Sequence, residues 1–255
     1  MIPASKDPLK FIQFDKVPRL VEKYKGLVTL PLDLPMFKLD NSDEFWSIWN
    51  SQCEDVKRQH IDRGALGITN PQLSVVQWQG ISIYENLFLL SKLAWNTKMS
   101  AALAQSQKNF TKQIFDGLPF LKIRSIRFWS AVMPIPAHYD GQYPEQLEGV
   151  FDFPTEIRIM LHDENPNQTF WLTDATKYNS HATVDNQDKY YIKLPSTSNI
   201  FAWNNESYLH GADFDPAYKK ILVVIKGWIS DMDLYEEFLD RSISKYSDYL
   251  IKDNK

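Results

Sequence analysis

The segment LKIRSIRFWSAVMP, residues 121–134, begins the part of the chain that decides the fold. It is short and rich in β-branched and aromatic residues, which favour strands. Five further segments of this kind follow it: TEIRIMLHD (155–163), QTFWLT (168–173), KYYIKL (189–194), NIFAW (199–203) and KKILVVIKGW (219–228). Because no helical segment separates these strands, we expect them to pair antiparallel in a sandwich or barrel.

The first half of the chain has a different pattern. Residues 1–40 carry several prolines between short apolar pieces, which indicates extended chain and turns. We expect a helix that begins after an N-cap at Ser42 or Asp43 and runs to about Gly64. Residues 86–115 contain no Gly or Pro and have apolar residues at helical spacing, so they predict one long helix or two abutting ones.

Two more segments complete the predicted layout. Residues 74–85 alternate enough to form a strand or hairpin, and the polar stretch 231–247 is expected to be a C-terminal helix. The predicted fold class is α+β. We expect one domain over residues 1–255, with a mainly helical N-terminal portion (1–118), a β core (119–230) and a C-terminal helix and tail (231–255).

Composition excludes several classes of function. The formal net charge of −4 provides no global basic field for nucleic acid or anionic lipid, so neither partner is expected. No apolar run approaches the roughly 18 residues that a bilayer span needs, and the first residues lack a signal-peptide layout. The single cysteine, Cys53, allows no internal disulfide and no cysteine-based zinc site. We therefore expect a reducing, cytoplasmic setting.

Two of the five histidines begin an H-x-D pattern, and the predicted secondary structure differs between the two patterns. In a helix, residues two apart point about 200° away from each other, so His60 and Asp62 cannot share a metal ion. His138 and Asp140 follow a predicted strand, where residues two apart project to the same face. The sequence therefore favours His138 and Asp140 as a pair of metal ligands.

Two imidazoles and one carboxylate form the triad that holds non-haem Fe(II) and leaves coordination sites open. His210 is the best candidate for the second imidazole, because it precedes a strand that carries Lys220. A lysine in such an apolar run needs an anionic partner. An alternative triad is His162 and Glu164 with His210, whereas the fifth histidine, His181, lies in a polar stretch expected to be a loop.

The ordered set of these residues resembles the Fe(II)/2-oxoglutarate-dependent oxygenases, and most closely their aspartyl/asparaginyl β-hydroxylase branch. The set consists of His138-x-Asp140, the strand Arg158-Ile-Met160-Leu161, Asn205-Glu-Ser207-Tyr-Leu-His210 and Lys220 ten residues further on. The resemblance covers about residues 121–228. The branch usually has arginine at the position of Lys220, histidine at that of Met160 and aspartate at that of Asn205.

The resemblance implies a double-stranded β-helix core, which is a jelly-roll, cupin-like fold. It implies Fe(II) bound by His138, Asp140 and His210, and 2-oxoglutarate as cosubstrate with its distal carboxylate on Lys220 or Arg158. The residues implied around these groups are Asn205, Ser207, Met160 and His162. The implied activity is hydroxylation of an unactivated C–H bond in an amino acid or peptidyl residue, with release of succinate and CO2. The expected partner is thus a small-molecule or peptide substrate.

Three alternatives remain open from the sequence. In the first, Arg158 forms an inter-strand salt bridge with a carboxylate such as Glu156. In the second, the chain is a non-catalytic jelly-roll protein that binds sugar or peptide through Trp171, Trp203, Trp228 and the nearby tyrosines. In the third, it is a metal-dependent cupin that does not use 2-oxoglutarate, and Lys220 then has no explanation.

Overall fold

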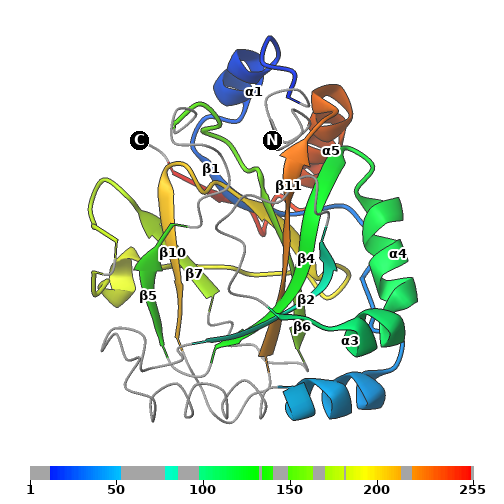
Figure 1. The fold of residues 1–255 in the computed structure, drawn as a ribbon. Helices are drawn as coiled ribbons and strands as arrows, with labels where there is room; N and C mark the ends of the chain where they lie inside the picture. Colours follow the sequence, from blue (N-terminus) through cyan, green and yellow to red (C-terminus); the bar gives the residue numbers. More distant parts are fainter. Residues whose placement is uncertain are drawn as a thin grey trace, which may run out of the picture.

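The computed structural model describes residues 12–52, 78–85, 98–131, 134–139, 149–162, 170–180, 182–213 and 220–253. They form a mixed α and β fold with two sheets (Figure 1). All strand pairs are antiparallel except the short parallel pair of β2 and β3.

The larger sheet has the strand order β12-β1-β9-β6-β11-β4-β2-β3. Its strands are β1 (Leu27–Pro31), β2 (Trp78–Glu85), β3 (Lys98–Met99), β4 (Leu121–Ala131), β6 (Glu156–His162), β9 (Ile200–Trp203), β11 (Lys220–Ile229) and β12 (Ile251–Lys252). The smaller sheet has the order β5-β10-β7-β8. Its strands are β5 (Ile135–His138), β7 (Phe170–Asp174), β8 (Tyr190–Tyr191) and β10 (Tyr208–Ala212).

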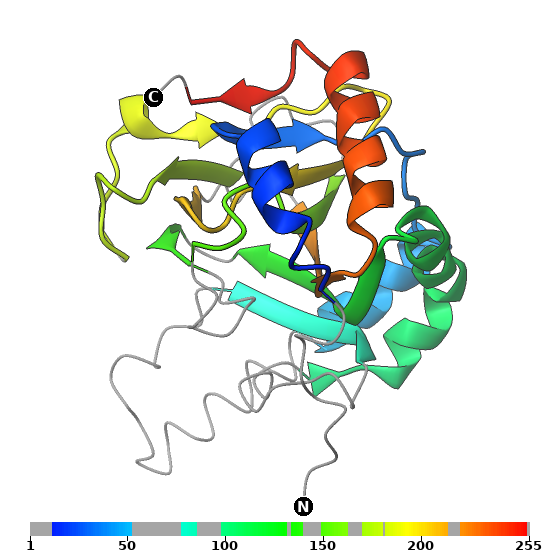
Figure 2. The same ribbon diagram turned by 90° about the horizontal axis from the view of Figure 1, so that it is seen from above.

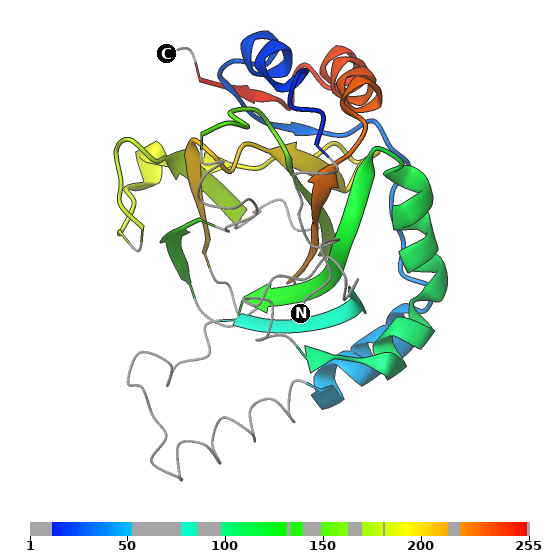
Figure 3. The same ribbon diagram turned by 45° about the horizontal axis from the view of Figure 1, so that its top comes forward.

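The helices lie on the face of the larger sheet that is turned away from the smaller sheet, as Figures 2 and 3 show. We call this the outer face. They are α1 (Val17–Lys23), residues 42–52, α3 (Ala101–Ser106), α4 (Lys108–Gly117) and α5 (Met232–Lys245), and a short 3-10 helix (Asn186–Asp188) precedes β8. No helix in the described part of the chain is long and apolar enough to cross a membrane.

Side chains that alternate along β6 show that the two faces of the larger sheet pack against different clusters of residues. Ile157 and Ile159 belong to the main apolar core under the helices. Met160 packs on the opposite side, with Phe170 and Leu172 of the smaller sheet. We call the face that each sheet turns toward the other its inner face. Because side chains alternate along a strand, Arg158 shares the inner face with Met160.

The predicted strands of the second half are all present, and α5 lies within the predicted C-terminal helix. The prediction of one long helix or two abutting ones over residues 86–115 is wrong at Lys98–Met99, where β3 pairs with β2. Two abutting helices, α3 and α4, do follow that strand. Ser100 is the N-cap of α3, and its side chain accepts a hydrogen bond from the Leu103 N–H. Residues 86–97 lie outside the described part.

The first 118 residues also contribute more strands to the larger sheet than predicted: β2 lies within the predicted strand or hairpin 74–85, whereas β1 and β3 were not predicted. All five residues of β1 are buried. A strand covered on both faces shows no alternation, so its short apolar sequence did not separate it from irregular chain.

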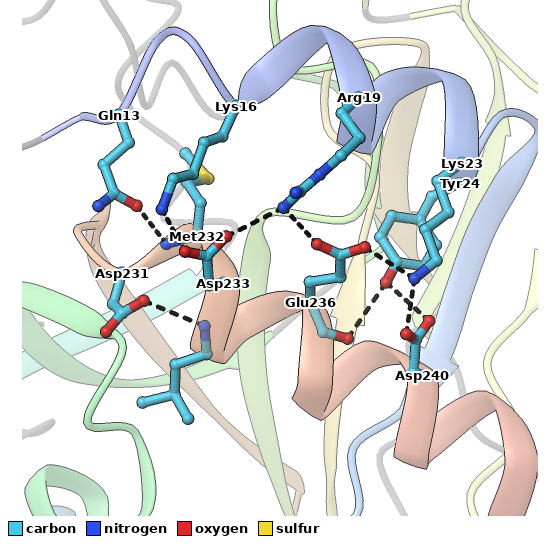
Figure 4. A network of polar contacts seen from close by, with 11 residues as sticks. Gln13, Lys16, Arg19, Lys23, Tyr24, Asp231, Met232, Asp233, Glu236 and Asp240 are labelled. Carbon is cyan, nitrogen blue, oxygen red and sulfur yellow. Dashed lines mark hydrogen bonds and ion pairs between the residues drawn. The ribbon is translucent and has the colours of Figure 1, made fainter.

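A ladder of ion pairs joins α1 to α5 on the surface of the molecule (Figure 4). The basic and acidic residues have the same three-then-four spacing, so each side chain meets one or two partners. The pairs are Lys16–Asp233, Arg19–Asp233, Arg19–Glu236, Lys23–Glu236 and Lys23–Asp240. Tyr24 adds a hydrogen bond from its hydroxyl to the Asp240 carboxylate at 2.9 Å.

This ladder predicts a specific loss of stability in acid. Hydrogen bonds from Lys16 and Arg19 lower the pKa of Asp233. A lowered pKa means that the carboxylate stabilises the fold above its unfolded pKa of about 4, and that this contribution is lost as the pH falls through the folded pKa. We expect the melting temperature of the wild type to drop more steeply below about pH 4 than that of Asp233→Asn. Parallel pH profiles would contradict this role of the ladder.

Candidate metal centre

The smaller sheet brings together the two histidines that the sequence singled out. His138 ends β5, and it lies directly opposite His210 of β10 in the antiparallel register. The centroids of the two imidazole rings are 4.1 Å apart, with an angle of 45° between the ring planes. β5 and β10 lie side by side in Figure 1, on the side of the smaller sheet away from β8. Two imidazoles at this separation are close enough to share one metal ion.

A backbone carbonyl determines the tautomer of His138. The distance from its Nδ1 to the carbonyl oxygen of Pro136 is 2.9 Å. Because a carbonyl oxygen only accepts hydrogen bonds, this contact requires a proton on Nδ1. The neutral ring then carries its lone pair on Nε2, which is the form that binds a metal ion, and such an outer hydrogen bond also orients the ring.

His210 sits deeper, between aromatic side chains of both sheets. It is 5% exposed, and its ring centroid lies 4.8 Å from that of Trp203 and 5.5 Å from that of Phe170. Trp203 comes from β9 in the larger sheet, whereas Phe170 comes from β7 beside β10. This packing holds the imidazole in one orientation on the inner face of the smaller sheet.

Asp140, the predicted third ligand, lies outside the described residues. Within the residues that the structure describes, no group of three His, Cys, Asp or Glu side chains is placed to hold a metal ion. The structure therefore brings together two of the three predicted ligands, and the role of Asp140 stays a prediction.

Arg158 shares two aromatic contacts with His210. Its guanidinium carbon lies 5.8 Å from the ring centroid of Phe170 and 5.7 Å from that of Trp203. The residue is 2% exposed. Aromatic rings attract a guanidinium electrostatically, and the attraction is stronger where water is excluded. Its planar set of donors suits recognition of a carboxylate.

Glu156, considered above as a partner of Arg158, forms a buried ion pair with Lys226. The Lys226 Nζ donates to Glu156 Oε1 at 2.9 Å, and the two side chains are 9% and 0% exposed. Lys226 was not predicted as part of the site. It lies on β11 at an even spacing from Lys220, so strand alternation alone places both on one face of the sheet.

A further cation lies near this pair. Arg124 of β4 is 9% exposed, and its guanidinium carbon lies 5.6 Å from the ring centroid of Trp228. Burial lowers the pKa of Arg124, repulsion from Arg127 lowers it further, and attraction to Glu156 opposes both. These shifts indicate a concentration of positive charge on this part of the larger sheet.

The turn between β9 and β10 is tied to Asp152, which the sequence analysis did not identify. Asp152 Oδ1 accepts hydrogen bonds from Ser207 Oγ at 2.6 Å and from Asn204 Nδ2 at 2.7 Å. Asn204 Oδ1 in turn accepts from the Ser207 N–H at 3.2 Å. Ser207 thus fixes the strand that carries His210, and Asn205 is buried in the same turn. Asp152 lies in a loop without a motif, so no sequence signal marked it.

The remaining predicted residues fall on β6 and β11. Met160 is buried on the inner face at 7% exposure. His162 lies opposite Lys220 in the register of β6 and β11, on the larger sheet. The side chains of His162 and Lys220 lie outside the described part of the chain. The residues His60, Glu164 and His181 also lie outside it. The register thus pairs His210 with His138 and not with His162.

The three tryptophans proposed for a sugar- or peptide-binding platform are buried. Trp171, Trp203 and Trp228 are 3%, 0% and 3% exposed. Such a platform requires exposed ring faces, so this part of the alternative is wrong. The rings belong to the apolar packing of the two sheets.

Comparisons with known proteins add little to this geometry. No family model and no curated protein matches the sequence. Among solved structures, a prolyl-4-hydroxylase from Pseudomonas putida is similar over 83% of this chain and 97% of its own, with 11% sequence identity and a TM-score of 0.31. The functional proposal therefore rests on the site itself.

Proposed function

We propose that this chain is an Fe(II)- and 2-oxoglutarate-dependent dioxygenase. In this proposal the two sheets form a double-stranded β-helix of the jelly-roll, cupin-like kind. The observation that carries it is the pair His138 and His210, which meet across adjacent strands with 4.1 Å between ring centroids. Arg158 contacts the same two rings as His210, which supports it as a candidate anchor for a carboxylate near this pair.

The donor set fits Fe(II). His138 can present a neutral imidazole, because the Pro136 carbonyl accepts from its Nδ1–H. Asp140 lies two residues further along the chain and would supply the carboxylate, with His210 as the second imidazole. Two imidazoles and one carboxylate leave coordination sites open for other ligands. When bound, the iron supplies the activation of O2 that an unactivated C–H bond requires.

The protein residues then bind and orient the cosubstrate. 2-Oxoglutarate would bind the metal by its keto-acid end, and its distal carboxylate would meet the two candidate cations, Arg158 and Lys220. Arg158 has the geometry for two parallel hydrogen bonds to a carboxylate. Trp203 and Phe170 exclude water around it, which strengthens that interaction.

The proposed substrate is a free amino acid or a peptidyl residue, as in the aspartyl/asparaginyl β-hydroxylase branch that the sequence resembles. Hydroxylation would release succinate and CO2. The direct test is a turnover screen of the Fe(II)-loaded protein with free amino acids and peptides, with succinate as the readout. Succinate formation that requires both Fe(II) and 2-oxoglutarate is expected; its absence in every condition, including without added substrate, would contradict the proposal.

A metal-dependent cupin that uses no keto acid is the second candidate, favoured by the same histidine pair. It differs in one measurable respect, because its metal binding would not be coupled to 2-oxoglutarate. Tight metal binding together with no detectable binding of 2-oxoglutarate would favour this second candidate.

The two candidate anchors lead to a prediction for the cosubstrate. A charge-assisted hydrogen bond contributes about 1.5–3 kcal/mol, or roughly 10- to 150-fold in affinity. We expect Arg158→Gln and Lys220→Ala each to raise the apparent 2-oxoglutarate constant within this range, while metal binding survives because no ligand is changed. Lys219→Ala, one position away on the chain, is the matched control and should have little effect.

A titration of 2-oxoglutarate against all three variants separates the anchors. An unchanged constant in Arg158→Gln would assign the distal carboxylate to Lys220 alone. A large loss in Lys219→Ala would show that the strand presents its other face to the cosubstrate.

A further inference from the structure

Asp213 accepts hydrogen bonds from three side chains just after β10. Trp171 Nε1 and Lys189 Nζ donate to its Oδ1 at 3.1 and 2.9 Å, and the Tyr191 hydroxyl donates to Oδ2 at 2.7 Å. The donors come from β7, from β8 and from the residue before β8. One carboxylate, three residues after His210, thus ties β10 to the next two strands of the smaller sheet.

Trp171 also covers the backbone next to His210. It lies opposite Gly211 in the register of β7 and β10. A Cβ atom at Gly211 would lie 2.3 Å from Cζ2 of the Trp171 indole and 2.6 Å from the carbonyl oxygen of Ile135. Glycine is therefore required for the indole and β5 to approach this part of β10 so closely.

The β10–β5 ladder is irregular at the same place. His210 lies opposite His138, but the register between β10 and β5 shifts between His210 and Ala212. Such irregularities re-aim side chains and weaken the local ladder. Because the ladder between β10 and β5 is irregular here, side-chain contacts as well as strand pairing determine the position of the backbone after His210.

The three donors keep the Asp213 carboxylate ionised near neutral pH. Burial acts to raise the pKa of Asp213, but hydrogen bonds from Tyr191, Lys189 and Trp171 outweigh it, so the pKa is lowered. The Lys189 ammonium is held from a second side, since it lies 4.9 Å from the Trp171 ring centroid. The Lys189 side chain is 10% exposed and that of Asp213 is 40% exposed, so water screens this ion pair in part.

We propose that Asp213 is a positioning residue for the metal centre: its bonds to Trp171, Lys189 and Tyr191 clamp the outer face of the smaller sheet and thereby fix His210 opposite His138. This inference rests on the proposed metal function, to which it adds a residue that touches neither metal nor substrate. Groups bonded directly to a metal ligand typically change metal affinity by about 10- to 100-fold, and because Asp213 acts one contact further out, we expect an effect at the lower end of this range.

The chain offers a matched control for the test. Asp240 of α5 also accepts from a lysine and a tyrosine, with Lys23 Nζ at 2.6 Å and the Tyr24 hydroxyl at 2.9 Å. It lies in the α1–α5 ladder on the outer face of the larger sheet (Figure 4). Asp213→Asn and Asp240→Asn therefore remove the same kind of contact at two sites, and only one of these sites is next to His210.

The experiment measures two properties of the full-length protein. The first is the dissociation constant for Co(II), followed by its visible absorption. The second is amide hydrogen exchange of residues 208–212 in the metal-free protein. We expect Asp213→Asn to weaken Co(II) binding by about 10-fold and to speed this exchange, and Asp240→Asn to leave both at wild-type values. Lys189→Met removes a single donor, and it provides a milder variant with the same direction of change.

The outcomes separate this inference from the function on which it rests. Wild-type Co(II) affinity in both Asp213→Asn and Lys189→Met would overturn the inference. If the wild type itself binds no Co(II), the proposed function fails. The exchange rates then test only whether the bonds of Asp213 hold β10 in place. Faster exchange in Asp213→Asn than in Asp240→Asn would support the clamp, and equal exchange would overturn it.

Discussion

Replacing either His138 or His210 with alanine is expected to abolish Fe(II) binding. Each substitution leaves a single imidazole where the structure brings two together with 4.1 Å between ring centroids. The loss should exceed the roughly 10- to 100-fold that outer contacts of a metal ligand contribute. Iron content after anaerobic loading and desalting gives the measurement.

His60→Ala and His181→Ala are the controls for this prediction, because the sequence places neither residue among the ligands. Both proteins should retain iron at the wild-type level. Full iron occupancy in His210→Ala would contradict the proposed ligand set, and it would move the centre to His162 or His181.

The second large effect is expected at the buried ion pair. Glu156→Ala leaves Lys226 without the carboxylate that lies 2.9 Å from its Nζ, at a site where the two side chains are 0% and 9% exposed. Removing one partner of a buried pair typically costs about 3–5 kcal/mol of stability. Urea unfolding of Glu156→Ala should show a loss of this size.

A double variant separates the pair from simple loss of packing. Glu156→Leu combined with Lys226→Met replaces both charges by apolar groups of similar size, and such replacements are often neutral or stabilising. The double variant should therefore be more stable than Glu156→Ala. If the single and double variants are equally destabilised, packing and not charge accounts for the effect.

The strands of the second half could be predicted because their sequences differ sharply from the turns between them. β4, β6 and β11 are long and contain β-branched and aromatic residues, and their predicted positions agree with the structure. β5 and β10 escaped prediction because they are short and are interrupted by Pro136 and Gly211. Both nevertheless carry the candidate ligands. Proline and glycine are poor strand formers, so strand propensity did not indicate the two strands that carry the candidate ligands.

His138 could be singled out because the two side chains of an H-x-D pattern meet only on an extended chain, and His210 because it precedes the strand with Lys220. The structure brings the two histidines into register, and their role as metal ligands stays a prediction. The supporting residues were not predictable. Asp152 and Asp213 act through bonds to residues far along the chain, with Ser207 and Lys189 among their partners. Such contacts depend on tertiary packing, and no spacing rule in a single sequence records them. Lys226 lies on the same strand as Lys220, and only the tertiary structure shows that it meets Glu156.

The most direct test of the function is the binding of 2-oxoglutarate to the protein with and without Fe(II), measured anaerobically by calorimetry. A keto acid that chelates the metal should bind tightly only when Fe(II) is present, and the binding should disappear in His210→Ala. Binding that is absent from the Fe(II)-loaded wild type, or equally strong without the metal, would contradict the assignment of this chain as a 2-oxoglutarate-dependent oxygenase.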